Sequence, residues 1–142
     1  MERLAPLVLE YIVGFYRQPR PSDDDLRALI EVGVDGRDGA SFLAEEDGRL
    51  LGFATLYFSW STLRAGRIAI MNDLYVVEAA RGTRVAADLF RTCAEESARR
   101  GCVEMTWETA PDNVRAQRFY DRLGGHRGEW VTYSIDTPRE DR

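Results

Sequence analysis

Apolar residues recur at helical spacing in the first part of the chain. Between positions 4 and 16 they return every three or four residues, which predicts an amphipathic helix over residues 4–16. Two prolines follow and end this helix. Ser22, with Asp25 three residues later, is typical of the capped start of a second helix. The inward face of that helix carries Leu26, Leu29 and Ile30.

The middle of the chain changes to the patterns of β-strands. Residues 41–58 contain two apolar runs joined at Asp47-Gly48, a dipeptide that favours a hairpin turn. A further strand is predicted over residues 67–77, where large apolar, aromatic and β-branched residues follow one another. These three strands are antiparallel neighbours in the predicted sheet.

The second half of the chain alternates helices and strands. An apolar face at helical spacing starts near Val85, and the strand predicted over residues 102–108 follows this helical crossover, so it lies parallel to its partner. A last helix ends at Gly124-Gly125, and the alternation over residues 129–135 predicts a closing strand. The sequence therefore predicts a mixed α/β fold with one central mixed sheet flanked by helices.

The loop over residues 78–84 joins a strand to a helix. The first N–H groups of a helix have no partner within it, and the helix dipole favours negative charge there. Arg81 and Arg84 add cations, and Gly82 removes the Cβ that would hold a phosphate away from the backbone. The loop is interpreted equally well as a phosphate cradle or as an ordinary turn with two solvated arginines.

Composition narrows the class of protein. The chain of 142 residues fits a single domain over residues 1–142. Its formal charge of −5 argues against nucleic acid as the main partner and mildly favours a cationic substrate. No apolar run is long enough to cross a membrane, and no signal peptide is recognisable, so we expect a cytoplasmic protein. Cys93 and Cys102 match neither a metal site nor a disulfide framework, and no metal is expected.

Residues 72–120 resemble a known family. Arg81-Gly-Thr-Arg-Val-Ala86 is similar to the Gln/Arg-x-x-Gly-x-Gly/Ala pyrophosphate loop of the GNAT superfamily of acetyl-CoA-dependent N-acetyltransferases. Leu74-Tyr-Val76 resembles the strand that pairs with the pantetheine arm. Asn113-x-x-Ala116-x-x-Phe119-Tyr120-x-x-x-Gly124 resembles the second CoA-contacting helix. The resemblance implies the GNAT fold, in which two central parallel strands splay apart to admit the thioester.

The resemblance also implies acetyl-CoA as the cofactor and the residues that hold it. Those residues are Leu74, Tyr75, Val76, Arg81, Gly82, Thr83, Arg84, Val85, Ala86, Ala87, Asn113, Ala116 and Tyr120. Arg84 departs from the family pattern, because its position is usually glycine. If the position needs a positive φ, Arg84 is strained there; if it does not, Arg84 adds a phosphate contact.

The first two helices correspond to the floor of the family's acceptor site. Glu10, Tyr11, Tyr16 and Asp23 are therefore candidate substrate contacts. Tyr11 is interpreted more simply as a core residue, and Asp23 as a solvated helix start. Trp107 is a candidate wall for an aliphatic amine, with core packing as the plainer alternative.

The strand that usually precedes the first helix of the family is missing from this chain. Its loss leaves an open sheet edge at residues 41–45, which favours a homodimer, unless the natural chain begins further upstream.

Amine acetylation needs a base, a hydrogen-bond donor that stabilises the oxyanion intermediate, and an acid. By its place in the motif, Tyr120 is the candidate acid for the leaving thiolate, and the backbone N–H of Val76 is the candidate oxyanion donor. Asn72 stands where polyamine-acetylating relatives carry Glu, and an amide accepts no proton, so Asn72 is expected to orient the amine or a water. Asp73, on the opposite face by strict alternation, Glu108 and a water chain are alternative bases; Asp73 could equally be structural.

The sequence thus predicts an N-acetyltransferase that acetylates a primary amine of a small cationic molecule by direct transfer from acetyl-CoA. Trp107-x-Thr109 and Trp130-x-x-Tyr133 make the chain similar to the branch that acts on polyamines and diamines, free amino-acid amines and basic protein tails. An aminoglycoside-type antibiotic acetyltransferase and a catalytically silent acyl-CoA-binding module are the alternatives.

Overall fold

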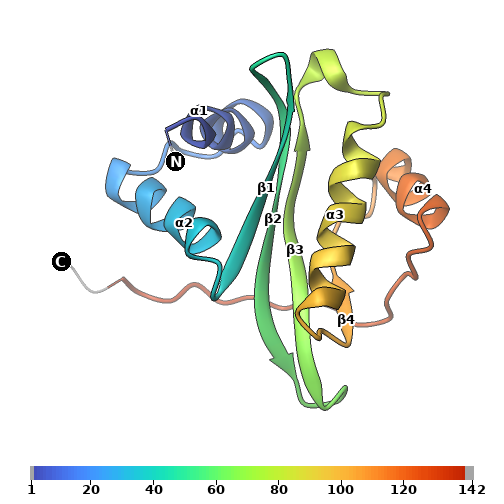
Figure 1. Ribbon diagram of the computed structural model, residues 1–142. Helices are drawn as coiled ribbons and strands as arrows, with labels where there is room; N and C mark the ends of the chain where they lie inside the picture. Colours follow the sequence, from blue (N-terminus) through green and yellow to red (C-terminus); the bar gives the residue numbers. More distant parts are fainter. Residues whose placement is uncertain (1, 140–142) are drawn as a thin grey trace. The chain divides into compact units, whose positions relative to one another are not determined.

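Two compact units make up the computed structural model, which describes residues 2–139. The larger unit spans Met1–Glu108 and the smaller unit spans Thr109–Arg142. In the larger unit a twisted sheet has helices on both faces (Figure 1). No helix among the described residues is both long and apolar enough to span a bilayer.

The first predicted helix forms, but only its first half is α-helical. Helix α1 spans Leu4–Leu9 and continues without a break as a π-helix, η1, over Glu10–Phe15. The N–H of Tyr16 donates to the carbonyl of Tyr11, five residues back, at 3.0 Å. Runs of π-helix are rare and occur frequently at functional sites.

Helix α2 spans Asp23–Asp35 and begins where the sequence predicts. The hydroxyl of Ser22 accepts a hydrogen bond from the N–H of Asp25 at 3.1 Å, which satisfies one of the unpaired donors at the helix start. The helix ends at Gly36, which has a left-handed φ of 76°.

The sheet contains four strands in the order β1-β2-β3-β4. They are β1 Gly39–Glu46, β2 Arg49–Ser61, β3 Gly66–Val76 and β4 Glu104–Thr106. The first three are antiparallel and β4 is parallel to β3, so the predicted mixed sheet is confirmed. Asp47 and Gly48 both have positive φ, as the predicted hairpin turn requires. The fourth strand is shorter than predicted, because its pairing with β3 covers three residues only.

The sheet separates two layers of helices. Helices α1, η1 and α2 cover one face, and α3, Val85–Arg99, covers the other (Figure 1). Phe53 and Tyr75 are buried with residues of α1 and α2 in one apolar cluster. Neighbouring Gly52 faces the other way, since a Cβ on it would lie 3.2 Å from Leu89 of α3.

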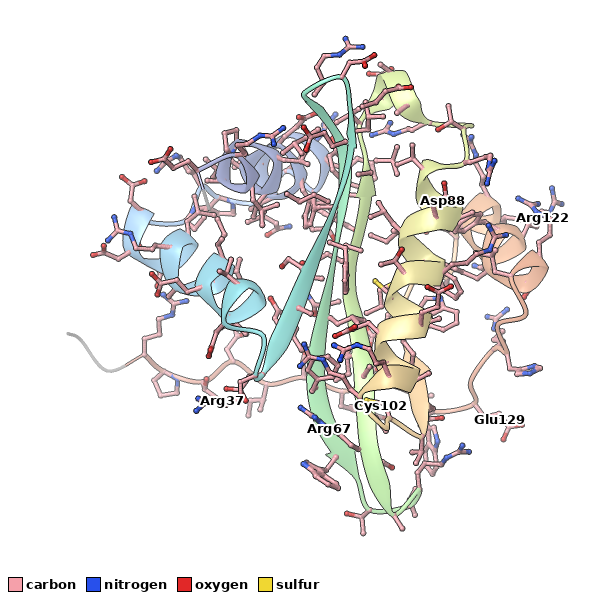
Figure 2. All side chains as sticks on the ribbon, viewed as in Figure 1. Arg37, Arg67, Asp88, Cys102, Arg122 and Glu129 are labelled. Atoms are coloured by element: carbon pink, nitrogen blue, oxygen red, sulfur yellow. The ribbon has the colours of Figure 1, made fainter. Side chains whose placement is uncertain are left out.

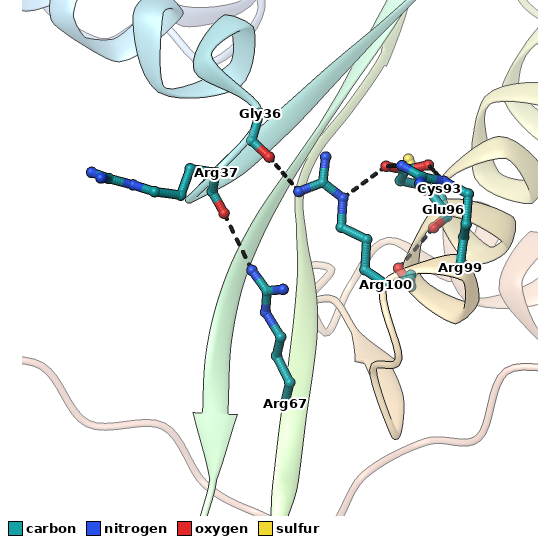
Figure 3. A network of polar contacts seen from close by, with 8 residues as sticks. Gly36, Arg37, Arg67, Cys93, Glu96, Arg99 and Arg100 are labelled. Atoms are coloured by element: carbon teal, nitrogen blue, oxygen red, sulfur yellow. Dashed lines mark hydrogen bonds and ion pairs between the residues drawn. The ribbon is translucent and has the colours of Figure 1, made fainter.

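Arg100 ties the ends of α2 and α3 together (Figure 3). Its Nε donates to the Glu96 carboxylate at 2.7 Å, and its Nη1 donates to the carbonyl of Gly36 at the end of α2. The guanidinium carbon also lies 4.5 Å from the centre of the Phe58 ring. This contact joins the helix layers around the end of the sheet.

Arg67, at the start of β3, makes the same two kinds of contact as Arg100, with a carbonyl and with the Phe58 ring. It donates to the carbonyl of Arg37 at 3.2 Å, and its guanidinium carbon lies 4.7 Å from the Phe58 ring centre. Arg37 and Arg67 lie together at the end of the sheet remote from the Asp47 turn (Figure 2). Two arginines therefore contact one aromatic ring and two consecutive carbonyls that follow α2.

The smaller unit contains one helix, α4, over Val114–Arg122. Its end at Gly124, with φ 90°, is as predicted, and the N–H of Gly125 donates to the carbonyl of Tyr120 at 3.0 Å. The prediction of a closing strand over residues 129–135 is wrong, because this segment has no regular secondary structure. Alternation favours a strand only where a neighbouring strand supplies hydrogen bonds.

Candidate active site

The two parallel strands open into a fork. Strand β4 pairs with β3 only from Ile68 to Ile70, whereas β3 continues to Val76. In the described sheet, the rest of β3 is paired on its β2 side alone. The other edge presents main-chain N–H and C=O groups that an extended ligand can pair with.

Val76 directs its main chain toward the fork. The N–H of Val77 donates to the carbonyl of Leu51 at 2.9 Å, and successive N–H groups of a strand point to opposite sides, so that of Val76 points away from β2. The carbonyl of Val76 accepts a hydrogen bond from Nε of Arg81 at 3.1 Å. The N–H predicted to stabilise the oxyanion therefore lies on the open edge, and its role stays a prediction.

The loop after β3 has the geometry of an anion cradle. A 3-10 turn, η2, covers Glu78–Ala80, and Gly82 has φ 78°, with open space where its Cβ would be. Arg84 has φ −75° and ψ −7°, so position 84 places no strain on a side chain. The first N–H groups of α3 have no partner within the helix. These features fit a pyrophosphate, and Arg84 is compatible with them.

The two loop arginines have different surroundings. The Arg84 side chain is 88% exposed and lies 3.9 Å from the Asp88 carboxylate, a solvated pair. Arg81 lies over the rings of Phe15 and Tyr75, at 5.4 and 5.9 Å from their centres. A guanidinium has five N–H donors, so Arg81 can hold Val76 and still donate to a phosphate.

The remaining predicted cofactor contacts of the larger unit lie on the open part of β3, in the loop after it and at the start of α3. Leu74 belongs to the part of β3 beyond the fork, and Val85, Ala86 and Ala87 form the first turn of α3. Thr83 donates its hydroxyl to the carbonyl of Ala80 at 2.5 Å and so braces the loop. Their contacts with a cofactor stay predictions.

A bulge in β3 changes the orientation expected for Asn72 and Asp73. Thr55 of β2 pairs with Asp73, and Leu56 pairs with Met71, so Asn72 is an extra residue without a partner. The two side chains consequently line the same cavity. The prediction that they face opposite sides is wrong, because alternation holds only along an uninterrupted strand.

That cavity, of about 230 Å³, lies on the sheet face covered by α1, η1 and α2. Its purely hydrocarbon wall consists of Leu4, Val8, Ile12, Leu29, Ile30 and Phe53. Its polar groups belong to Tyr11, Ser41, Thr55, Tyr57, Asn72 and Asp73. Among these described lining residues, Asp73 is the single carboxylate, and none is cationic.

The Asp73 carboxylate is surrounded by neutral groups. Burial raises the pKa of Asp73, and hydrogen bonds with Asn72, Tyr11 and Thr55 oppose that rise. The amide of Asn72 donates to Asp73 at 3.1 Å. A carboxylate held in this way attracts a cation and accepts a proton more readily than a solvated one.

The predicted substrate contacts at the start of the chain are separated by the fold. Tyr11 lines the cavity, where burial and then the neighbouring Asp73 charge raise the pKa of its hydroxyl, so it remains a proton donor in hydrogen bonds. Exposed Tyr16 packs edge-on against Tyr11 at 4.9 Å. Glu10 accepts a hydrogen bond from the Tyr75 hydroxyl at 2.9 Å instead of lining the cavity. Asp23 pairs with Arg20 at the exposed start of α2.

Trp107 and Glu108 lie outside the cavity. Trp107 packs edge-on against Phe90 of α3 at 5.1 Å, on the opposite face of the sheet. Glu108 is exposed. Of the two carboxylates considered as bases, only Asp73 lines the cavity. One sequence signal for this site was missed, which is the polar Thr55 within an otherwise apolar strand.

The smaller unit carries the other predicted contacts. Asn113 accepts a hydrogen bond from the N–H of Ala116 at 3.1 Å and thereby caps α4. Tyr120 lies on α4 with its ring 5.3 Å from that of Phe119. The role of Tyr120 as an acid stays a prediction.

The described part of the chain contains no cluster of metal ligands. Residues 2–139 contain no group of three His, Cys, Asp or Glu side chains that could hold an ion. Burial raises the pKa of Cys93 to about 12, which makes it a packed thiol and not a nucleophile.

Known proteins are similar to this chain in sequence and in fold. The sequence pattern of the acetyltransferase (GNAT) family matches residues 6–125. An uncharacterized N-acetyltransferase, YhfO of Bacillus subtilis (strain 168), is 30% identical over 137 residues, which cover 95% of this chain and 90% of that protein.

Two solved structures are similar along most of the chain. A probable acetyltransferase has a TM-score of 0.80 and 31% identity, covering 96% of this chain and 91% of that one. AAC(6')-Iy, in complex with the bisubstrate analog CoA-S-monomethyl-acetylneamine, has a TM-score of 0.72 and 26% identity, covering 84% and 83%.

Proposed function

The chain belongs to the acetyltransferase (GNAT) family, and from this premise we propose that it acetylates the primary amine of a small cationic molecule. As a family member it is an acyltransferase, with acetyl-CoA as the acyl donor. Polyamines, amino acids and related amines are the acceptor class. The observation that carries the proposal is the cavity with Asp73 as its single carboxylate.

The reaction first needs the substrate ammonium to lose a proton, and Asp73 is the proposed acceptor of that proton. An ammonium is attracted by a carboxylate that no arginine neutralises, and the raised pKa of Asp73 favours proton transfer to it. Asn72 and Asp73 follow Ile70, the last residue of β3 that pairs with β4. An amine at Asp73 therefore lies at the base of the fork.

The donor side uses the edge of β3 and the loop. Acetyl-CoA, when bound, would supply a thioester, and a C–N bond would form as the C–S bond breaks. The ammonium loses two protons in this reaction. One would go to Asp73 and then to solvent, and the leaving sulfur would take up the equivalent of the other. Arg81, Arg84 and the first N–H groups of α3 would hold the pyrophosphate. Val76 would donate its N–H to the acetyl oxygen. By its place in the sequence motif, Tyr120 would be the group that supplies the proton to sulfur.

A second candidate is acetylation of an aminoglycoside. It is favoured by the likeness to AAC(6')-Iy, whose structure contains an acetylneamine analog. A silent acyl-CoA-binding module is the candidate of another class, favoured by Asn72 in place of a carboxylate.

The decisive experiment combines binding and turnover. Calorimetric titration with acetyl-CoA and CoA should give micromolar binding, and an amine panel should then release thiol from acetyl-CoA. The chain has no lysine, so its own side chains offer no primary amine, and release in the absence of added amine is the background. Binding without amine-dependent release would leave the silent module.

The loop assignment is tested with a shortened donor. Arg81→Ala should weaken acetyl-CoA more than acetyl-pantetheine, because only acetyl-CoA has a pyrophosphate. Exposed Arg27 of α2 gives the matched control, Arg27→Ala. Equal losses for both donors would rule out the cradle.

The acid assignment is tested by removing one hydroxyl. Tyr120→Phe should lower kcat by roughly 10²- to 10⁴-fold with little change in affinity for CoA. An unchanged kcat would remove Tyr120 from the chemistry.

A further inference from the structure

The cavity at Asp73 is small for an acceptor site. Its volume is about 230 Å³. Pockets that enclose drug-sized ligands measure about 300 to 1,000 Å³. The space suits one short hydrocarbon body.

The lining also limits the number of charges. Beyond Asp73 the lining is uncharged: its hydrocarbon side includes the buried Leu4, Val8 and Ile30, and its other polar groups are hydroxyls and the amide of Asn72. Each methylene buried on such a wall strengthens binding about fourfold. A second ammonium placed there, without a second carboxylate, weakens binding by more than about a hundredfold.

We propose that the acceptor is a primary monoamine with one short apolar body, whose ammonium binds Asp73 and whose hydrocarbon lies against Leu4, Val8 and Ile30. This inference rests on the proposed function and narrows it. Within the class of small cationic amines it ranks alkyl and arylalkyl monoamines above diamines and aminoglycosides. The reacting nitrogen lies at the fork, and the body extends toward α1 and α2.

The test compares amines that differ in one property at a time. Thiol release at saturating acetyl-CoA is measured with propylamine, hexylamine, benzylamine, 1,6-diaminohexane and an aminoglycoside. Hexylamine should exceed propylamine in kcat/KM by about 50-fold, from three buried methylenes. It should exceed the diamine of equal length by at least about tenfold, since the diamine can leave its second charge in water.

A charge added to the wall should reverse the preference. Leu29 lines the cavity from α2 and is 41% exposed, so Leu29→Glu places a carboxylate there without deep burial. It should raise kcat/KM for 1,6-diaminohexane by about two- to fivefold and lower that for hexylamine. Val34→Glu is the control, because Val34 is on the same helix, is 60% exposed and lies outside this cavity.

The outcomes separate the inference from the function beneath it. Turnover in which the diamine or the aminoglycoside equals or exceeds hexylamine overturns the inference and leaves the acetyltransferase standing. Binding of acetyl-CoA with no thiol release by any amine overturns both. A response of Val34→Glu equal to that of Leu29→Glu would show that general surface charge, and not the cavity, sets the preference.

Discussion

Asp73 and Glu96 are both partly buried carboxylates in the larger unit, yet the fold treats them in opposite ways. Burial raises the pKa of Asp73, whose hydrogen-bond partners are neutral. Hydrogen bonds from Arg99 and Arg100 lower the pKa of Glu96 to about 2. Glu96 lies in the network that joins α2 to α3 (Figure 3), and Asp73 lies in the cavity on the other side of the sheet.

The difference distinguishes a carboxylate that stabilises the fold from one that remains available to a ligand. Glu96 is fully compensated by cations that the chain supplies, so it has nothing left to offer a ligand. Asp73 is compensated only in part, which costs stability and leaves an electrostatic demand that an ammonium can meet. Partial compensation of one buried charge, and not the number of charges, marks the site.

The largest effect is expected from removing the charge of Asp73. Asp73→Asn keeps the size of the side chain but removes the proton acceptor, so kcat/KM for the amine should fall by roughly 10²- to 10⁴-fold. The dissociation constant of acetyl-CoA, measured by calorimetry, should stay within about threefold. Glu96→Gln is the matched control and should keep full activity; a comparable loss there would erase the contrast between the two carboxylates.

A smaller effect, on stability, is expected from Arg100. Arg100→Ala leaves Glu96 half-compensated, opens the contact with Gly36 and exposes Phe58, and we expect a loss of about 2–3 kcal/mol in the free energy of unfolding. Arg99→Ala removes a guanidinium that is 69% exposed, and should cost less than about 1 kcal/mol. Urea denaturation of the two variants gives both values, and equal losses would mean that Arg100 is no more than a surface partner.

Neutralising Glu96 should have a still smaller effect. Glu96→Gln retains hydrogen-bond acceptors for both arginines but removes the charge assistance, and should cost about 1 kcal/mol at neutral pH. The same urea titrations measure it. A stabilised Glu96→Gln would show that the carboxylate is over-buried and not well compensated.

The smallest effect is a difference in how stability depends on pH. The raised pKa of Asp73 means that the folded state holds its proton more tightly, so this group lowers stability as pH rises from its ordinary pKa through the raised one. Glu96, with a lowered pKa, contributes stability above its ordinary pKa that is lost as pH falls toward about 2. Melting temperatures between pH 7 and pH 3 should therefore show Asp73→Asn above the native chain at pH 7, with the gap closing in acid. Glu96→Gln should start below the native chain and also converge in acid.

Local signals allowed much of the fold to be predicted. The capping serine at position 22, the Asp47-Gly48 turn and the crossover after β3 depend on residues that are neighbours in sequence, and the structure confirms them. The loop after β3 was recognised for the same reason, because its glycine, its arginines and the helix start are consecutive.

The cavity could not be predicted in this way. It collects side chains from α1, η1, α2 and three strands, and the orientation of Asp73 depends on a bulge opposite Thr55 and Leu56. A bulge is set by the register of two strands, which no residue within β3 specifies alone. The closing strand was wrong for a related reason, since alternating residues do not name their pairing partner.

The π-helix that follows α1 has a consequence for how acceptor sites of this kind can diverge. A π-helical turn holds one residue more than the α-helical turn it replaces, so deleting a residue such as Gly14 would restore the shorter turn. Because the wider turn absorbs the extra residue, the helix before and after it would keep its direction, and the residues inside the turn, such as Tyr11 and Ile12, would change theirs. The sheet and the loop proposed to hold the cofactor lie outside this segment. Single-residue insertions and deletions at this point are therefore a route by which a lineage can change the side chains that this turn presents to the cavity, while the donor site is inherited intact.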